Sequence, residues 1–151
     1  MEYDAVGNLT AKIYPNGARE KYEYDAKYRV TKITGANDGV TSYEYDNSDK
    51  NTAIVDALGN RTEFGYDSFN RLGSMKDPKG NTYNFEYDRN GNRTKTIVPD
   101  GSSIISVYDA RGRIRSQTDQ SGFETRYAYD GLKRKLKISN RYYRKVNIFY
   151  D

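Results

Sequence analysis

The chain has 151 residues, of which 35% are hydrophobic and 30% charged, and its net charge is +4. This length suits a single domain, and the aromatic content of 14% argues against a disordered chain. The absence of Cys excludes disulfides and zinc–thiolate sites, and the absence of His removes the commonest general base and metal ligand. No stretch is apolar enough to predict a membrane span, and residues 1–10 do not resemble a signal peptide.

A Tyr-Asp pair recurs through the whole chain at a constant interval of 21 residues, without an insertion. This frame predicts one repeat domain, 1–151, made of seven units: 3–23, 24–44, 45–65, 66–86, 87–107, 108–128 and 129–149. Each Tyr is counted here as position 1 of its unit, and the pairs are Tyr3-Asp4, Tyr24-Asp25, Tyr45-Asp46, Tyr66-Asp67, Tyr87-Asp88, Tyr108-Asp109, Tyr129-Asp130 and Tyr150-Asp151.

Two turn signals punctuate each unit. The first has the form Asp-x-x-Gly, as in residues 88–91, and the second has the form Asp-Pro-x-Gly, as in residues 77–80. In such turns Asp accepts backbone N–H groups, Pro presets the second residue and Gly supplies a left-handed one. Asp38 replaces the second glycine in one unit, and the other glycines of this column are Gly17, Gly59, Gly80, Gly101 and Gly122.

The segments between the turns have the length and composition of β-strands, as in 9–13 and 82–87. No segment has a sustained helical period, so essentially no helix is predicted. Position 20 and the next Tyr are two residues apart, which places both on the same face of the sheet. We interpret these Tyr and Phe columns as the buried face, together with Leu9, Val30, Leu72 and Ile114.

The residues between the two aromatic columns point to the opposite face, where Glu23, Glu44 and Glu86 indicate contact with water. The expected fold is therefore all-β, a repetitive antiparallel β-hairpin array that forms a long curled or spiralling sheet.

The averaged unit, Tyr-Asp-x-x-Gly-Arg-Leu-Thr followed by Asp-Pro-x-Gly, resembles the YD repeat, also called the Rhs repeat. This repeat occurs in bacterial Rhs toxins, insecticidal toxin complexes, wall-associated proteins and teneurins. The resemblance implies a spiralling β-shell, which encloses an effector polypeptide in the toxins and belongs to an adhesion ectodomain in teneurins. It also implies a link to carbohydrate binding. Nothing in the sequence matches the Pro/Gly-rich block and self-cleavage site of Rhs cores, so fold transfers better than whole-protein function.

The acidic residues suggest two kinds of site, and both have a structural alternative. Asp88, Asn90 and Asn92 alternate like the start of a calcium loop, but the acidic residue that ends such a loop is missing. We therefore interpret the repeat Asp residues as groups that close turns and form surface ion pairs with Arg at position 6. A regular row of Glu is typical of a solvated column, so neither a catalytic pair nor a cofactor is predicted.

The last unit differs because it is strongly basic and lacks the Asp-Pro-x-Gly turn. The stretch between Gly131 and Phe149 contains seven cations and no acidic residue, which leaves a net charge of −3 for the remainder of the chain. It is interpreted as a diverged cap that guards an edge strand, or as a surface for a glycan, another polyanion or an acidic partner, with nucleic acid less favoured. The candidate surface is Lys133, Arg134, Lys135, Lys137, Arg141, Tyr142, Tyr143, Arg144 and Lys145.

The expected function is non-enzymatic: a structural module of a shell or scaffold, within or derived from a larger bacterial secreted or cell-surface protein. We expect its partner to be a second copy of the chain, as a homodimer or larger oligomer, or the rest of a larger YD-repeat polypeptide. The alternative is a carbohydrate- or polyanion-binding module that uses the basic last unit and the aromatic residues outside the two columns, namely Tyr14, Tyr28, Phe69, Tyr83 and Phe123.

Overall fold

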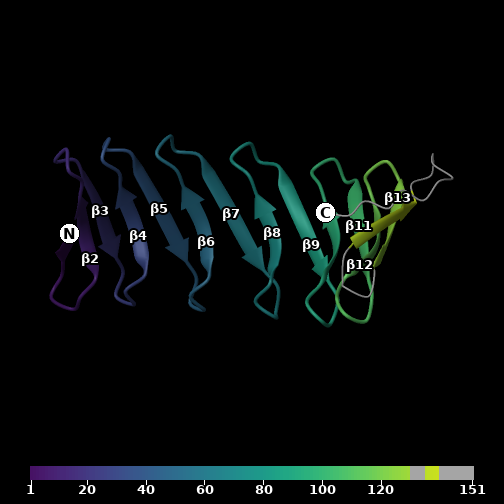
Figure 1. Cartoon of the computed structure of the whole chain (residues 1–151). Helices are drawn as coiled ribbons and strands as arrows, with labels where there is room; N and C mark the ends of the chain where they lie inside the picture. The colour runs from purple at the N-terminus through teal and green to yellow at the C-terminus, as the bar shows by residue number, and fades with distance from the viewer. Residues whose placement is uncertain (130–134, 140–151) are drawn as a thin grey trace. The chain divides into compact units, whose positions relative to one another are not determined.

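A computed structural model describes residues 1–129 and 135–139 of the chain. Within this part of the chain there are fourteen β-strands and no helix (Figure 1). The strands form one open antiparallel sheet in which they follow their order along the sequence. The expected all-β hairpin array is therefore confirmed. Among the described residues there is no helix long and apolar enough to cross a membrane.

The strand boundaries repeat with the same period as the Tyr-Asp pairs. After the short strand β1 (Glu2–Tyr3), strands of five and six residues alternate. The five-residue strands are β2 (Leu9–Ile13), β4 (Val30–Thr34), β6 (Asn51–Val55), β8 (Leu72–Lys76), β10 (Arg93–Ile97), β12 (Ile114–Thr118) and β14 (Lys135–Ser139). The six-residue strands are β3 (Arg19–Tyr24), β5 (Val40–Tyr45), β7 (Arg61–Tyr66), β9 (Thr82–Tyr87), β11 (Ser103–Tyr108) and β13 (Glu124–Tyr129).

The chain packs as two compact parts, each made of several repeat units. The first part consists of Met1–Arg71 with Met75–Asn81, and the second of Leu72–Ser74 with Thr82–Asp151. In the first part each strand from β1 to β7 pairs antiparallel with the next. In the second part the same holds from β9 to β14.

Both kinds of turn have the same backbone geometry. In the turn at residues 77–81, the Gly80 N–H donates to the Asp77 carbonyl and the Asp77 N–H donates to the Asn81 carbonyl, each at 2.9 Å. Gly80 has a φ of 86°, so the loop is a tight turn that ends in a left-handed residue. Residues other than glycine take the left-handed position in four of the described turns, with φ between 61° and 64°: Tyr28, Asp38, Asp49 and Asn70. Asp38, which stands in the glycine column of the sequence, thus adopts the conformation that glycine has in the other turns.

The aromatic face, defined by the Tyr and Phe columns at positions 1 and 20, lies on one side of the sheet as predicted. Tyr22 is directly opposite Ile33, and Tyr43 is directly opposite Ile54. The interpretation of this face as buried is wrong, however. Among the described residues, Tyr3 is exposed and the other Tyr and Phe of the two columns are half-buried, as are Leu9, Val30, Leu72 and Ile114. The described strands form one sheet, and within the described residues no second layer covers these side chains.

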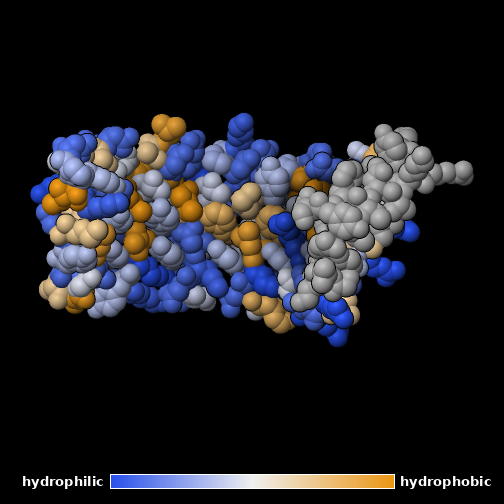
Figure 2. Space-filling view, in the orientation of Figure 1, coloured by the Kyte–Doolittle hydropathy of each residue, from blue (hydrophilic) through white to orange (hydrophobic). Residues whose placement is uncertain are grey.

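The residues with the least exposure are small. Ala11 is 3% exposed and Ala53 is fully buried, while Ser106 and Ser116 are 9% and 8% exposed. Ala11, Ala53 and Ser116 all occupy position 9, on the face opposite the aromatic columns, which we name the charged face after Glu23, Glu44 and Glu86. Figure 2 shows hydrophobic residues interspersed with hydrophilic ones on the side in view.

Candidate functional site

The repeated Tyr side chain connects each unit to the preceding one. Its hydroxyl donates a hydrogen bond of 2.8–2.9 Å to the backbone carbonyl of the residue fifteen positions earlier, at the start of the neighbouring strand. The six bonds are Tyr24–Leu9, Tyr45–Val30, Tyr66–Asn51, Tyr87–Leu72, Tyr108–Arg93 and Tyr129–Ile114. The Tyr column is therefore a structural element of the repeat, and sequence reasoning did not identify the hydroxyl's partner.

The repeated Asp closes its turn with both carboxylate oxygens. In Asp25, Oδ1 accepts the N–H groups of Lys27 at 2.8 Å and Arg29 at 3.0 Å. Its Oδ2 accepts Nε of Arg29 at 2.7 Å, and this bond is the main reason why the pKa of Asp25 is lowered. Asp77 has the same arrangement in the second type of turn, where Asn81 takes the place of Arg29 and lowers the pKa of Asp77.

The predicted ion pairs between the repeated Asp and Arg at position 6 occur in three turns: Asp25–Arg29, Asp67–Arg71 and Asp109–Arg113. Their distances are 2.6–2.7 Å and the side chains are 22–28% exposed. The expected pairs therefore form, and their side chains are half-buried. Arg29 and Arg113 also stack on the next Tyr of the column, Tyr45 and Tyr129, at 4.6 and 4.3 Å.

The calcium-like pattern forms a turn of the same kind. Asp88 Oδ1 accepts the N–H groups of Asn90 and Asn92 at 2.9 Å, and its Oδ2 accepts Nδ2 of Asn92 at 2.8 Å. The side chain of Asp88 therefore has the turn-closing role predicted for it. Across the described ranges, His, Cys, Asp and Glu do not gather in groups of three or more that could hold a metal ion.

Charged side chains of the charged face form ion pairs with one another. Each Glu of the predicted row pairs with a cation. Glu23 pairs with Lys32 at 2.9 Å and Glu86 with Lys95 at 3.6 Å, in both cases on the adjacent strand, whereas Glu44 pairs at 2.5 Å with Arg61, two strands away. Arg61 lowers the pKa of Glu44, so this carboxylate is ionised and is not suited to donate a proton.

Arg61 also explains why Ala53 is buried although it lies on an outer face. Ala53 is directly opposite Glu44 on one side and Glu63 on the other. Arg61 pairs with both carboxylates, at 2.5 and 3.0 Å, so its side chain extends across the methyl group between them. Position 9 can thus be small because longer side chains of the neighbouring strands cover it.

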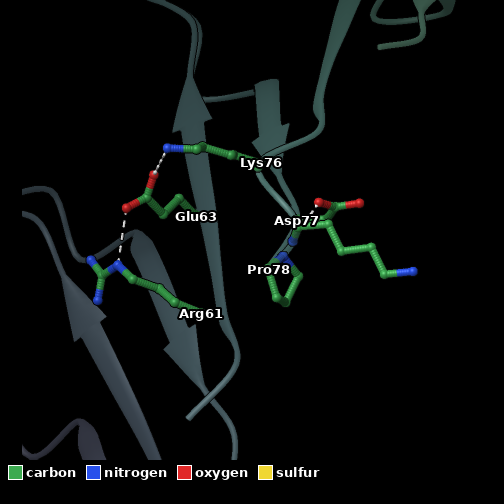
Figure 3. A pocket seen from close by; sticks show the side chains of 7 residues that line it. Arg61, Glu63, Lys76, Asp77 and Pro78 are labelled. Atoms are coloured by element: carbon green, nitrogen blue, oxygen red, sulfur yellow. Dashed lines mark hydrogen bonds and ion pairs between the residues drawn. The ribbon is translucent and has the colours of Figure 1, made fainter.

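A cavity of about 340 Å³ lies beside this bridge, between Arg61, Glu63, Lys76 and the turn at residues 77–80. In Figure 3 the Glu63 carboxylate lies between Arg61 and Lys76, with Asp77 and Pro78 on the next turn. Arg61, followed by Lys76, lowers the pKa of Glu63. The cavity therefore presents ion-paired groups, a chemistry suited to weak polar contacts and not to acid–base catalysis.

The aromatic residues outside the columns do not form one platform. Tyr28 and Phe69 are 61% and 76% exposed on separate turns, whereas Tyr14 and Phe123 are half-buried. Tyr83 is two residues from Phe85 along β9 and so belongs to the aromatic face, which corrects its assignment to the outer surface.

Most of the candidate basic surface cannot be placed. Of its nine residues, Lys135 and Lys137 lie in β14, and the others fall outside the described residues, as do Asp130, Tyr150 and Asp151.

Comparisons with known proteins agree with the repeat geometry. The model of the Teneurin YD-shell family matches residues 1–107, and that of the RHS repeat matches residues 108–143. No curated protein matches the chain.

Several solved structures share its fold. A Tc holotoxin pore of Photorhabdus luminescens with a mutated TccC3 has a TM-score of 0.72 at 16% identity, covering 93% of this chain and 9% of that one. The TcdB2-TccC3-Cdc42 structure has a TM-score of 0.72 at 15% sequence identity, covering 97% of this chain and 9% of that one. The TcdB2-TccC3-TEV structure has a TM-score of 0.73 at 16% identity, covering 93% of this chain and 9% of that one. The chain thus spans about a tenth of these chains, and the likeness shows the fold alone.

Proposed function

Since the chain belongs to the Teneurin YD-shell family, we propose that it is a wall segment of a β-shell within a larger secreted or cell-surface polypeptide. The observation that carries this proposal is the hydroxyl-to-carbonyl bond made by six successive Tyr residues. Each unit makes one such hydrogen bond to the preceding unit, and these bonds hold neighbouring hairpins in register. This role is structural and needs no catalytic group. The role of such a chain is to continue a sheet, with its seven units acting as one repeat domain.

The two faces have different roles in this proposal. Ion pairs already satisfy the long side chains of the charged face, which suits contact with water. Apart from the exposed Tyr3, the described Tyr and Phe of the aromatic face are half-buried, and this face gains stability when another surface covers it. In a complete shell that surface belongs to the same large polypeptide, and for the isolated chain it is a second copy.

The test is the solution mass of the full chain, by light scattering after size-exclusion chromatography, with far-UV circular dichroism on the same sample. A wall segment is expected to give a β-rich dimer or a larger discrete oligomer. A heparin column and a glycan array test the alternative, with Lys and Arg of the last unit changed to Gln as the matched variant. A β-rich monomer that a glycan or heparin retains, and that the Gln variant releases, would replace the wall segment with a binding module.

A further inference from the structure

The charged face changes character at strand β11. At positions 19 and 21 the other five described units have at least one charged residue each: Lys21/Glu23, Ser42/Glu44, Glu63/Gly65, Asn84/Glu86 and Arg126/Ala128. In β11 both positions are aliphatic, Ile105 and Val107, and these side chains are 42% and 46% exposed. The repeat itself therefore provides the comparison: at this place alone among the described units, the outer face replaces ionic contacts with apolar area.

Val107 separates two hollows of the surface. One, of about 530 Å³, also contacts Ile105 and Tyr108 and extends to the turns that contain Asp88 and Asp109. The other, of about 190 Å³, is lined by Val107 with Arg115, Ser116, Glu124 and Arg126. Val107 lines both hollows, and the small side chain of Ser116 is directly opposite it. We refer to the two hollows and the aliphatic pair Ile105 and Val107 as the β11 groove.

The rim next to Val107 is cationic. Arg126 is directly opposite Ser116 and its side chain is 67% exposed while it pairs with Glu124. Arg115 is exposed and contributes to the same hollow, so two guanidinium groups face one carboxylate there. A ligand that complements this rim has a negative charge.

We propose that the β11 groove, which includes Ile105, Val107, Arg115, Ser116 and Arg126, binds an extended segment of a protein partner. The segment presents two aliphatic side chains two residues apart, because Ile105 and Val107 have that spacing along one strand, about 6.8 Å. An Asp or Glu next to the second aliphatic residue meets the arginine rim. The inference is independent of the shell-wall proposal, which concerns the aromatic face.

The size of the groove argues against a permanent contact between two copies at this place. Stable protein interfaces bury roughly 1,200–2,000 Å² in total. Two partly exposed aliphatic residues bordered by the ion pairs Lys95–Glu86 and Arg126–Glu124 offer far less than that. A short segment that docks weakly and reversibly suits this area.

The test uses the full chain and a fluorescein-labelled peptide with the central sequence Thr-Val-Thr-Val-Asp-Asp, measured by fluorescence anisotropy. The variant Ile105→Lys with Val107→Glu gives β11 the pair that the first unit has at Lys21 and Glu23, so the repeat fold tolerates it. We expect saturable binding by the original chain and affinity reduced at least about tenfold in the variant. Circular dichroism and light scattering verify that fold and oligomeric state are the same.

Two controls separate the groove from general apolar adhesion. A peptide with Lys in place of both Asp is expected to bind about tenfold less tightly, and Arg126→Gln should reduce this preference. The variant Lys21→Ile with Glu23→Val creates an aliphatic pair in the first unit, without the arginine rim, and should leave the affinity unchanged. Three results would overturn the proposal: equal affinity of the β11 variant and the original chain, tighter binding by the Lys21→Ile, Glu23→Val variant, or no saturation of the original chain. Saturation is tested up to about 1 mM peptide, which corresponds to a binding free energy of only about 4 kcal/mol.

Discussion

The hydroxyl of Tyr66 donates a 2.8 Å hydrogen bond to the carbonyl oxygen of Asn51, across a half-buried part of the aromatic face. We expect Tyr66→Phe to lower the free energy of unfolding by about 1 kcal/mol, because the partly desolvated carbonyl loses its donor while the ring remains. The measurement is urea unfolding followed by circular dichroism.

Tyr3 provides the control for this substitution. It occupies the same column, but its hydroxyl donates a hydrogen bond to the sulfur of Met1, and the residue is 59% exposed on the surface. Tyr3→Phe is expected to leave the unfolding midpoint unchanged. Equal midpoints for the two variants would show that the repeated hydroxyl does not stabilise the sheet.

The left-handed residue of the turn can be tested at Gly80, which has a φ of 86° and no atom within 4 Å of an added Cβ. Gly80→Ala should lower the free energy of unfolding by about 1–2 kcal/mol. Because the added methyl group meets no other atom, this loss measures the strain of the left-handed backbone alone. Gly80→Asn should cost less, since Asn70 takes the same conformation in its own turn at φ 62°. The order of the two thermal midpoints is the readout, and Ala at or above Asn would refute this explanation.

The carboxylate of Asp56 should matter more than the apolar side chain beside it. Its Oδ1 accepts the N–H groups of Leu58 and Asn60 at 2.8 and 2.9 Å, while Leu58 is 87% exposed. Asp56→Ala leaves two turn donors without their acceptor and is expected to lower the thermal midpoint. Leu58→Ala in the same turn is the matched control and should not change it. A larger loss from Leu58→Ala would contradict the turn-closing role.

Acid should destabilise the sheet through these turns. Hydrogen bonds from neighbouring side chains and N–H groups lower the pKa of the turn Asp residues below the ordinary value of 3.8. A carboxyl with a lowered pKa in the folded state stabilises the fold above its unfolded pKa, and this contribution disappears as pH falls through the folded pKa. The thermal midpoint is therefore expected to fall steadily once the pH drops below about 4.

Changing Asp to Asn in several turns should make this acid dependence shallower, because the titrating group is removed. The residues suited to this experiment are Asp25, Asp56, Asp67, Asp77 and Asp109. An unchanged pH profile in the multiple variant would assign the acid sensitivity to other groups.

The sequence predicted the local structure well because its signals are local. Asp, Pro and Gly at fixed offsets specify tight turns, and each turn determines how the next two strands pair. Asp38 is consistent with this column, because it stands where the other units have glycine and its φ is 61°.

Which side chains are buried could not be predicted from the sequence in the same way. Alternation assigns Tyr22 and Tyr24 to one face, but it does not say whether a second layer covers them. Ala53 was overlooked because its burial depends on Arg61, which reaches from the next strand to two carboxylates. Such a bridge depends on the cross-strand register, and nothing in the residue pattern of one strand reveals it.

The fixed reach of the Tyr hydroxyl restricts how proteins of this kind change length. The hydroxyl meets its carbonyl only if the two residues stay fifteen positions apart. Duplication or deletion of a whole unit joins equivalent positions and leaves every bond possible, whereas the loss of one residue inside a strand turns its side chains to the other face. Recombination between two such genes should therefore give a folded product only when both break points fall at the same position of the repeat.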